Sequence, residues 1–478
     1  MEISKPHILV LASPGMGHLI PVLELAKRLV SLNTLHVTLF IVSTETSTSL
    51  AQLLKTSSDF HLDLEIIDLT PGNISELVSI NESVVHRLAI IMRQSLTGLR
   101  SAIKGMKSPP TALIVDIFGV DAFDLAAELS VPKYLFVTST AWFVALTIYA
   151  PTLDEIIEGE YIDLTDPIPI PGCKPIRPSE LVDPMLSRKS QQYKEYLNLG
   201  TRMPMPDGLL LNTWEDLEPQ SLKAFQENDI LRQIMKPRIY PIGPIVRNVG
   251  PEGIDNKCLD WLGKQPSESV LYVSFGSGGT LSSEQMTELA WGLELSQHRF
   301  IWMARPPTDS DTSGSFFNSN STSTDPSVYL PEGFLTRTVG QGMVVTRWSP
   351  QEYILAHPST GGFLSHCGWN SILESIINGV PMIAWPLYSE QRMNAAMLEE
   401  ELGVAVRAEL LASKAVSREE IDKMVRFLME SKEGKMLRNK VKDVKNGALK
   451  AIAKDGSSYN ALLDMVKVWE TNNKEEEM

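Results

Sequence analysis

Residues 348–391 read WSPQEYILAHPSTGGFLSHCGWNSILESIINGVPMIAWPLYSEQ, and this stretch is the strongest indication of the fold. Gly361, Gly362 and the apolar residues that follow form a run typical of a buried parallel strand. Residues 366–370, His-Cys-Gly-Trp-Asn, then turn the chain into a helix predicted to begin near Ser371. A helix start carries unpaired backbone N–H groups and the positive end of the helix dipole, which together bind phosphate. The stretch therefore predicts a strand, a turn and a helix that hold an anion.

The rest of the chain repeats this alternation of strand and helix. Apolar runs of strand length lie at residues 7–12, 37–42, 112–115, 134–137, 208–211, 270–274, 300–303, 343–345, 363–365 and 382–385. Strands that alternate with helices indicate parallel sheets in doubly wound α/β domains. The chain of 478 residues exceeds what one hydrophobic core usually serves, and the Pro- and Gly-rich segment 240–253 reads as a linker. We therefore predict two Rossmann-like domains on either side of this segment.

Polar side chains follow the carboxyl ends of the predicted strands. They are His18, Asp116, Thr138, Ser277, Trp348, His366, Glu390 and Gln391. Ligands of open α/β sheets bind at that edge of the sheet. With two such domains facing each other, we expect the ligand cleft between them.

Composition limits the possible partners and compartments. The net charge is −15 and the sequence shows no basic stripe, which argues against a nucleic acid partner. Only three scattered cysteines occur, so no disulfide framework is indicated and a cytoplasmic location fits. The apolar run at 8–12 is too short for a signal peptide, and the longest other run is about half the roughly 20 residues that a membrane span needs. We expect a monomer without a membrane span.

Residues 348–391 resemble, nearly residue for residue, the donor-binding signature of plant family 1 UDP-dependent glycosyltransferases. The resemblance extends from residue 7 to about residue 469 and is closest to glucosyltransferases of hydroquinone, monolignols and related phenols. It implies a GT-B fold with an acceptor-binding domain at 1–245 and a UDP-sugar-binding domain at 246–456. A C-terminal helix at 457–478 would pack back on the first domain and end in a frayed acidic tail. UDP-glucose would be the co-substrate, with no metal ion or other cofactor.

The resemblance also implies the donor site. Trp348 would stack on uracil, Glu374 would accept from the ribose hydroxyls, and His366 would contact the diphosphate. The whole set is Thr138, Ser277, Trp348, Ser349, Gln351, His366, Gly368, Trp369, Asn370, Ser371, Glu374, Glu390 and Gln391. An acidic triplet at 309–311 resembles a metal site of other glycosyltransferases, but it lies in a Ser-rich loop and we reject it.

Two donor positions depart from the family's usual residues, and three donor positions allow another interpretation. Ser349 replaces the usual alanine, Glu390 replaces the common aspartate, and Gln391 matches the glucose-preferring members. Trp348 and His366 could instead be structural residues. Residues 371–374, Ser-Ile-Leu-Glu, also match a capping box, which needs no ligand.

The acceptor site is expected in the first domain, where residues 13–21, SPGMGHLIP, follow the first strand. A neutral histidine can remove a proton from an attacking hydroxyl, and a carboxylate on its other nitrogen would stabilise the imidazolium. His18 and Asp116 match the catalytic dyad of the family, although Asp116 could instead cap the following helix. Phe118, Trp142 and Phe143 are candidate acceptor walls that could equally be core.

We therefore expect an inverting UDP-glucose-dependent O-glucosyltransferase of small phenols of the hydroquinone, monolignol, coumarin or flavonoid type. One rival is an NAD-dependent oxidoreductase in which Glu45 holds an adenosine ribose. Another is a non-catalytic protein that binds a UDP-sugar or a phenol.

Overall fold

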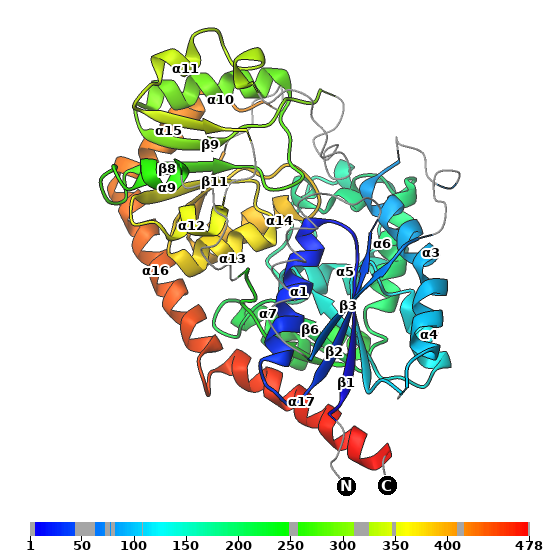
Figure 1. Ribbon diagram of the computed structural model, residues 1–478. Coiled ribbons are helices and arrows are strands. Elements are labelled where there is room, and N and C mark those ends of the chain that lie inside the picture. Colours follow the sequence, from blue (N-terminus) through cyan, green and yellow to red (C-terminus); the bar gives the residue numbers. More distant parts are fainter. Residues whose placement is uncertain are drawn as a thin grey trace. The chain divides into compact units, whose positions relative to one another are not determined.

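The computed structural model describes residues 5–43, 63–71, 77, 82–107, 109–247, 257–309, 325–346, 350–408 and 415–476. It divides into two compact units, the first formed by residues 1–246 and 450–478 and the second by residues 247–449. Each unit is a parallel sheet with helices on both faces (Figure 1). The predicted class of two Rossmann-like α/β domains is therefore confirmed.

Unit 1 contains a seven-stranded parallel sheet in the order β3-β2-β1-β4-β5-β6-β7. The strands are β1 (His7–Ala12), β2 (His36–Val42), β3 (Leu64–Leu69), β4 (Ala112–Asp116), β5 (Lys133–Val137), β6 (Gly208–Leu211) and β7 (Arg238–Pro241). The helices before the last one are α1 (Met16–Val30), α3 (Val84–Lys104), α4 (Ala122–Glu128), α5 (Ala141–Ile156), α6 (Gln191–Arg202), α7 (Pro219–Glu227) and α8 (Asp229–Ile234). Figure 1 shows α1 on one face of the sheet and α3 and α4 on the other.

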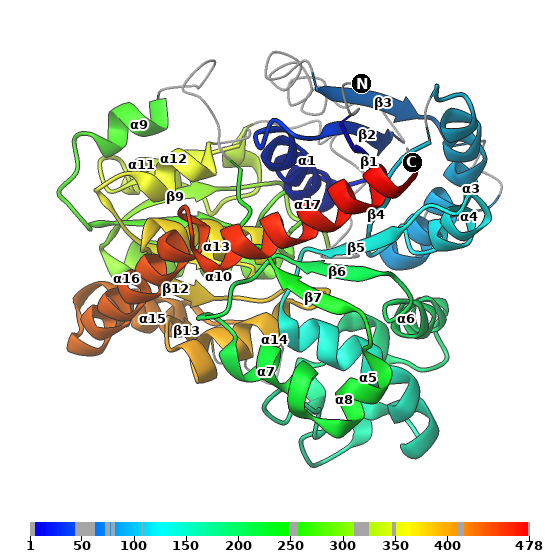
Figure 2. The same cartoon turned by 90° about the horizontal axis from the view of Figure 1, so that it is seen from below.

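The last helix, α17 (Ser457–Glu476), belongs to the core of unit 1. Its buried residues Leu462, Met465 and Trp469 lie in the same apolar cluster as the strands β1, β2 and β4. The ring of Trp469 meets Tyr134 edge-on at a centroid distance of 5.3 Å. The helix also lies along β7 (Figure 2). A segment at the end of the sequence thus completes a core that begins at residue 8.

Unit 2 contains a six-stranded parallel sheet in the order β10-β9-β8-β11-β12-β13. The strands are β8 (Val270–Ser274), β9 (Arg299–Met303), β10 (Gly342–Val345), β11 (Thr360–Ser365), β12 (Met382–Ala384) and β13 (Ala405–Arg407). The helices are α9 (Lys257–Leu262), α10 (Ser283–Ser296), α11 (Phe334–Arg337), α12 (Gln351–Ala356), α13 (Trp369–Asn378), α14 (Gln391–Ala396), α15 (Arg418–Glu430) and α16 (Lys432–Ile452), with a π-helical turn at Met397–Leu402. Figure 1 shows α10 and α15 on one face and α12 and α13 on the other.

The predicted linker is wrong at its start, because Tyr240 and Pro241 belong to β7. This strand is an edge of the sheet, where proline is tolerated because its missing N–H removes no ladder hydrogen bond. The N–H of Ile242 donates to the carbonyl of Leu211 (3.0 Å). The backbone groups of the alternate residues Pro237, Ile239 and Pro241 therefore point away from β6. The two prolines remove N–H donors from the open edge, which protects it against pairing with other chains.

The sequence patterns also miss β3 and β13. Both are short edge strands, and an edge strand needs no continuous apolar run because part of it faces water. Within the part of the chain that the structure describes, no helix is long and apolar enough to cross a membrane.

Candidate active site

Each sheet has one position where the direction of winding reverses. In unit 1 the chain adds β2 and β3 on one side of β1 and then places β4 on the other side. In unit 2 it adds β9 and β10 beside β8 and then places β11 on the other side. Ligands of open α/β sheets bind at the carboxyl ends of the strands at such switch points. His18 and Asp116 follow or end β1 and β4, and Ser277 and His366 follow β8 and β11.

The structure brings His18 and Asp116 together in unit 1. His18 lies in the first turn of α1, after Gly15, whose φ of 101° favours glycine. The Nδ1 atom of His18 lies 3.4 Å from Oδ2 of Asp116, and the His18 side chain keeps 17% of its surface exposed. Nδ1 thus points to the carboxylate, which leaves Nε2 as the nitrogen that can take a proton from an acceptor. The distance exceeds an ordinary hydrogen bond, as is common for catalytic pairs without substrate.

Asp116 is buried and is fixed by neighbours other than a helix. Its Oδ2 accepts from the backbone N–H of Ser13 (3.1 Å) and from the Ser13 hydroxyl. Its Oδ1 accepts from the N–H of Phe118 (3.2 Å). The alternative that Asp116 caps the next helix is wrong, because α4 begins at Ala122 with Asp121 at its N-cap position. Sequence patterns missed the role of Ser13, since only the pairing of β1 with β4 brings the two residues together.

The candidate acceptor walls lie near the dyad or in α5. The Phe118 ring meets His18 edge-on at a centroid distance of 5.0 Å. Trp142 and Phe143 occupy the first turn of α5 and are buried, and Phe143 packs against Tyr196 at 6.5 Å between centroids. Thr138 lies between β5 and α5 and so belongs to unit 1, unlike the other predicted donor residues that the structure describes.

His366 sits in a cradle formed by two glycines of unit 2. A Cβ on Gly276 would lie 2.5 Å from Cε1 and Nε2 of the ring, and a Cβ on Gly368 would lie 2.5 Å from Nε2. Burial, and then the positive charge of Arg305, lowers the pKa of His366 to about 4. The ring is therefore neutral at pH 7, and its Nδ1 has no hydrogen-bond partner among the described residues. It can offer an anion one N–H donor but no charge.

The helix after His366 begins earlier than predicted. Helix α13 starts at Trp369, with Gly368 at its N-cap position, so the N–H groups of its first turn include those of Asn370 and Ser371. Glu374 therefore lies in the second turn, and the capping-box alternative is wrong. Its Oε2 accepts from Nε2 of Gln351 (2.6 Å), which also donates to the hydroxyl of Ser371 (3.0 Å).

Glu374 is an unusual carboxyl. Burial is the main cause that raises its pKa to about 8, and the nearby Glu352 adds to the shift. The hydrogen bond from Gln351 and the charge of Arg247 act in the opposite direction. Perturbed carboxyl pKa values gather at functional sites, because they arise where a polar group is held out of water. A diol that donates to this carboxyl would supply the hydrogen bonds that bulk water does not.

Gln391 and Glu390 have most of their acceptor atoms engaged within the protein. The Oε1 of Gln391 accepts from the N–H groups of Leu387 (2.9 Å) and Tyr388 (3.1 Å). This fixes the amide orientation and leaves its NH₂ group as the part that can meet a ligand. The carboxyl of Glu390 accepts from Ser389 (2.5 Å) and from Asn394 (3.4 Å).

Some predicted residues lie outside the described part of the chain. They are Trp348 and Ser349 of the donor set and Glu45 of the oxidoreductase alternative. Of the rejected acidic triplet only Asp309 is described, and its carboxyl accepts from the N–H (2.8 Å) and hydroxyl (3.0 Å) of Ser283. Among the described residues no group of three His, Cys, Asp or Glu side chains could hold a metal ion.

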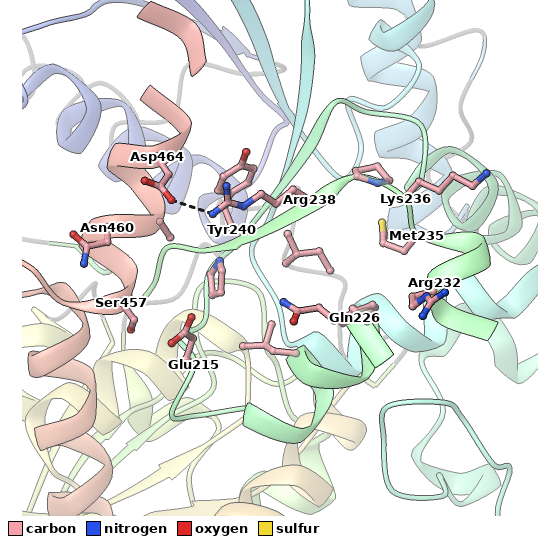
Figure 3. Close-up of a pocket in the computed structure, with 16 residues that line it drawn as sticks. Glu215, Gln226, Arg232, Met235, Lys236, Arg238, Tyr240, Ser457, Asn460 and Asp464 are labelled. Atoms are coloured by element: carbon pink, nitrogen blue, oxygen red, sulfur yellow. Dashed lines mark hydrogen bonds and ion pairs between the residues drawn. The ribbon is translucent and has the colours of Figure 1, made fainter. Parts of the chain in front are cut away.

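A cavity of about 780 Å³ lies elsewhere in unit 1, between β7, α7 and the start of α17. Asp464 of α17 reaches Arg238 of β7 across it at 3.0 Å (Figure 3). None of the predicted catalytic or donor-binding residues lines it. The cavity is therefore separate from the candidate site.

Residues 249–442 match the family model of UDP-glucoronosyl and UDP-glucosyl transferase. The chain is 51% identical to anthocyanidin 3-O-glucosyltransferase 5 of Manihot esculenta, over 98% of this chain and 96% of that protein. It is 44% identical to a hydroquinone glucosyltransferase of Rauvolfia serpentina, over 97% of this chain and 98% of that one. The crystal structure of TcCGT1 in complex with UDP is 60% identical and covers 98% of this chain and all of its own, with a TM-score of 0.93.

These similarities show that the chain belongs to the plant UDP-glycosyltransferases and has the GT-B type of fold. It is an enzyme of that class, and the oxidoreductase alternative is therefore wrong. The predicted resemblance to the subgroup that includes a hydroquinone glucosyltransferase is confirmed.

Proposed function

We propose that the protein is an inverting UDP-glucose-dependent O-glucosyltransferase of small phenols, in which His18 is the general base. The observation that carries this proposal is the pair formed by His18 and the buried Asp116, 3.4 Å apart at the switch point of unit 1. Three donors hold the carboxylate, so it can orient the imidazole and stabilise its charged form. The proposal requires both units to act on one pair of substrates.

The proposed reaction is a single displacement. The phenolic oxygen attacks the anomeric carbon while its proton passes to Nε2 of His18. The bond from the anomeric carbon to the diphosphate oxygen breaks, and UDP leaves with the electron pair. Because the attack comes from the face opposite the leaving group, the α-linked donor yields a β-glucoside. Removal of a proton by a positioned base contributes about 10²- to 10⁴-fold to such a rate.

The geometry of unit 2 supports the following proposal for the donor site. We assign the diphosphate to the first N–H groups of α13, to His366 and to Ser277. We assign the ribose hydroxyls to Glu374, with Gln351 beside it as a partner of the base edge. The NH₂ group of Gln391 and the carboxyl of Glu390 would meet the sugar hydroxyls. We propose that Trp348 and Ser349 contact the uracil, and this part of the proposal rests on the sequence alone.

The acceptor class rests on the relatives and on the aromatic residue beside the base. A hydroquinone glucosyltransferase and an anthocyanidin 3-O-glucosyltransferase are both similar over nearly the whole chain. The edge-on Phe118 offers a face beside His18 against which a planar phenol can pack. We further propose that the enzyme works in the cytoplasm as a monomer, without a metal ion. Turnover unchanged by a chelator and elution as a single chain in size-exclusion chromatography are the expected results.

The test is turnover of UDP-glucose with a panel of phenols, followed by mass spectrometry and by NMR of the product anomer. We expect β-glucosides, and we expect His18→Ala to lower kcat by about 100-fold or more while UDP still binds. Acid hydrolysis of the products separates O-glucosides, which release the phenol, from carbon-linked products, which do not. The control is His36→Ala, since His36 begins β2 at the opposite end of the same sheet.

Three results would contradict the proposal. Products with the α-anomeric configuration would exclude a single displacement. Equal turnover by His18→Ala and the wild type, with an acceptor that is not already ionised at the assay pH, would exclude His18 as the base. UDP binding without turnover of any acceptor would favour the non-catalytic alternative.

A further inference from the structure

Arg305 lies at the same edge of the unit 2 sheet as the proposed diphosphate site. It follows the carboxyl end of β9, and the sheet order places β9, β8 and β11 side by side. Ser277 follows β8 and His366 follows β11. Three neighbouring strands therefore deliver an arginine, a serine and a histidine to one edge. The sequence patterns did not single out Arg305, because a lone arginine after a strand carries no local signal.

Two contacts place the guanidinium of Arg305 next to this site. Its NH1 donates to the backbone carbonyl of Ser277. It also lines a small cavity together with Gly276, Gly279 and Thr280 of the glycine turn that carries Ser277. The same turn holds the ring of His366, since a Cβ on Gly276 would touch it. Arg305 thus contacts Ser277 directly through its backbone carbonyl, and it lines a cavity with Gly276, the residue that packs against His366.

The charge of Arg305 is not balanced by a carboxylate among the described residues. Its one hydrogen bond within them goes to a neutral carbonyl, which uses one of its five N–H donors. Arg305 is half-buried, and this partial withdrawal from water lowers its pKa. The whole chain carries a net charge of −15, so the positive charge of Arg305 is opposite in sign to the charge of the protein as a whole. Cations held out of water usually have an anionic partner.

His366 does not supply that charge, because its imidazole is neutral at pH 7. The N–H groups at the start of α13 offer only partial charges. A departing nucleoside diphosphate, in contrast, gains negative charge as its bond to the sugar breaks. His366, Ser277 and the start of α13 therefore supply no full positive charge at the place where negative charge develops.

We infer that Arg305 binds the diphosphate of the nucleotide donor directly and stabilises the charge of the leaving UDP. This inference rests on the proposed function and adds a residue to its donor site. The guanidinium keeps the Ser277 turn in place with one N–H and offers the others to phosphate oxygens. No bond of the protein is made or broken, since Arg305 remains protonated throughout.

The test compares the binding of uridine and of UDP by calorimetry in the wild type, Arg305→Gln and Arg305→Lys. Glutamine can still donate to the Ser277 carbonyl but has no charge, whereas lysine keeps the charge. We expect Arg305→Gln to weaken UDP binding by about 10- to 100-fold and to change uridine binding by less than about threefold. Arg305→Lys should retain most of the UDP affinity. The kcat of Arg305→Gln should fall by about 100-fold.

The matched control is Arg299→Gln, which removes the same charge from the exposed, opposite end of β9. It should leave both affinities within about twofold. The ratio of the two dissociation constants does not depend on the folded fraction of a sample, so partial unfolding of a variant does not hide the result.

The inference is overturned if Arg305→Gln binds UDP as the wild type does, or if uridine and UDP binding weaken in parallel. Equal losses in the glutamine and lysine variants would also overturn it, because the loss of UDP affinity would then not depend on the charge. If the wild type itself fails to bind UDP, the proposed function fails and not only this inference.

Discussion

The glycine cradle of His366 gives the most direct test of the donor site. Replacing Gly276 by alanine puts a Cβ at 2.5 Å from Cε1 and Nε2 of the ring. Carbon atoms pack at about 3.5 to 4.0 Å, so the ring or the turn must move by about 1 Å. Gly276 also has a φ of +72°, which costs a residue with a Cβ about 1 kcal/mol or more. The substitution therefore strains the turn and displaces the imidazole.

The expected result is a large loss of function with a moderate loss of stability. A displacement of about 1 Å in a residue that positions a substrate can lower the rate about 100-fold. We expect kcat/KM for UDP-glucose to fall by about that factor, while the free energy of unfolding falls by about 1 to 3 kcal/mol. Steady-state kinetics at a saturating phenol and chemical denaturation followed by tryptophan fluorescence measure the two quantities.

Gly340→Ala is the matched control for backbone strain. Gly340 has a φ of +83° in the same unit, but a Cβ there would meet nothing within 4 Å. It should show the stability loss of the left-handed backbone alone and keep wild-type kinetics. Should Gly276→Ala retain the activity of Gly340→Ala, the ring does not depend on the cradle and the reasoning is refuted.

Three further predictions follow from other parts of the structure. The raised pKa of Glu374 means that the folded protein holds a proton that the unfolded chain releases, so stability should fall as pH rises from about 4.5 to about 8. His7 and His366 have pKa values lowered to about 4, so they make stability rise with pH up to about 6.5. The melting temperature should therefore be compared between pH 6.5 and 8, where the effect of Glu374 dominates. In this window Glu374→Gln should remove most of the slope, and an unchanged slope would contradict the assignment. Gln391→Ala leaves two N–H groups without their acceptor, so it should lower the free energy of unfolding by about 1 to 3 kcal/mol. It should also weaken the binding of UDP-glucose but not of UDP in calorimetry, and equal weakening of both ligands would show that Gln391 does not meet the sugar. Trp469→Ala removes a fully buried ring from the core of unit 1 and should cost about 3 to 5 kcal/mol in denaturant titrations, whereas Val468→Ala, at an exposed neighbour in α17, should cost little.

Some of the fold could be predicted because its signals are local. Buried parallel strands are continuous apolar runs, and this made β1, β8 and β11 visible in the sequence. The edge strand β7 escaped because its prolines look like a linker, although proline is acceptable where one side of a strand has no partner. The helix start at Trp369 was placed too late because its N-cap residue, Gly368, makes no side-chain capping bond that a pattern could reveal.

The sequence by itself determined the class of the domains, the family and the polar residues at the strand ends, since a strand, a glycine turn and a helix start are set by neighbouring residues. Only the tertiary structure decided which of those residues meet. The hydroxyl of Ser13 reaches Asp116 because β1 pairs with β4, and Arg305 approaches Ser277 because β9 pairs with β8. Such contacts depend on the order of strands in a sheet. That order is established by packing between segments far apart in the chain, which no local pattern records.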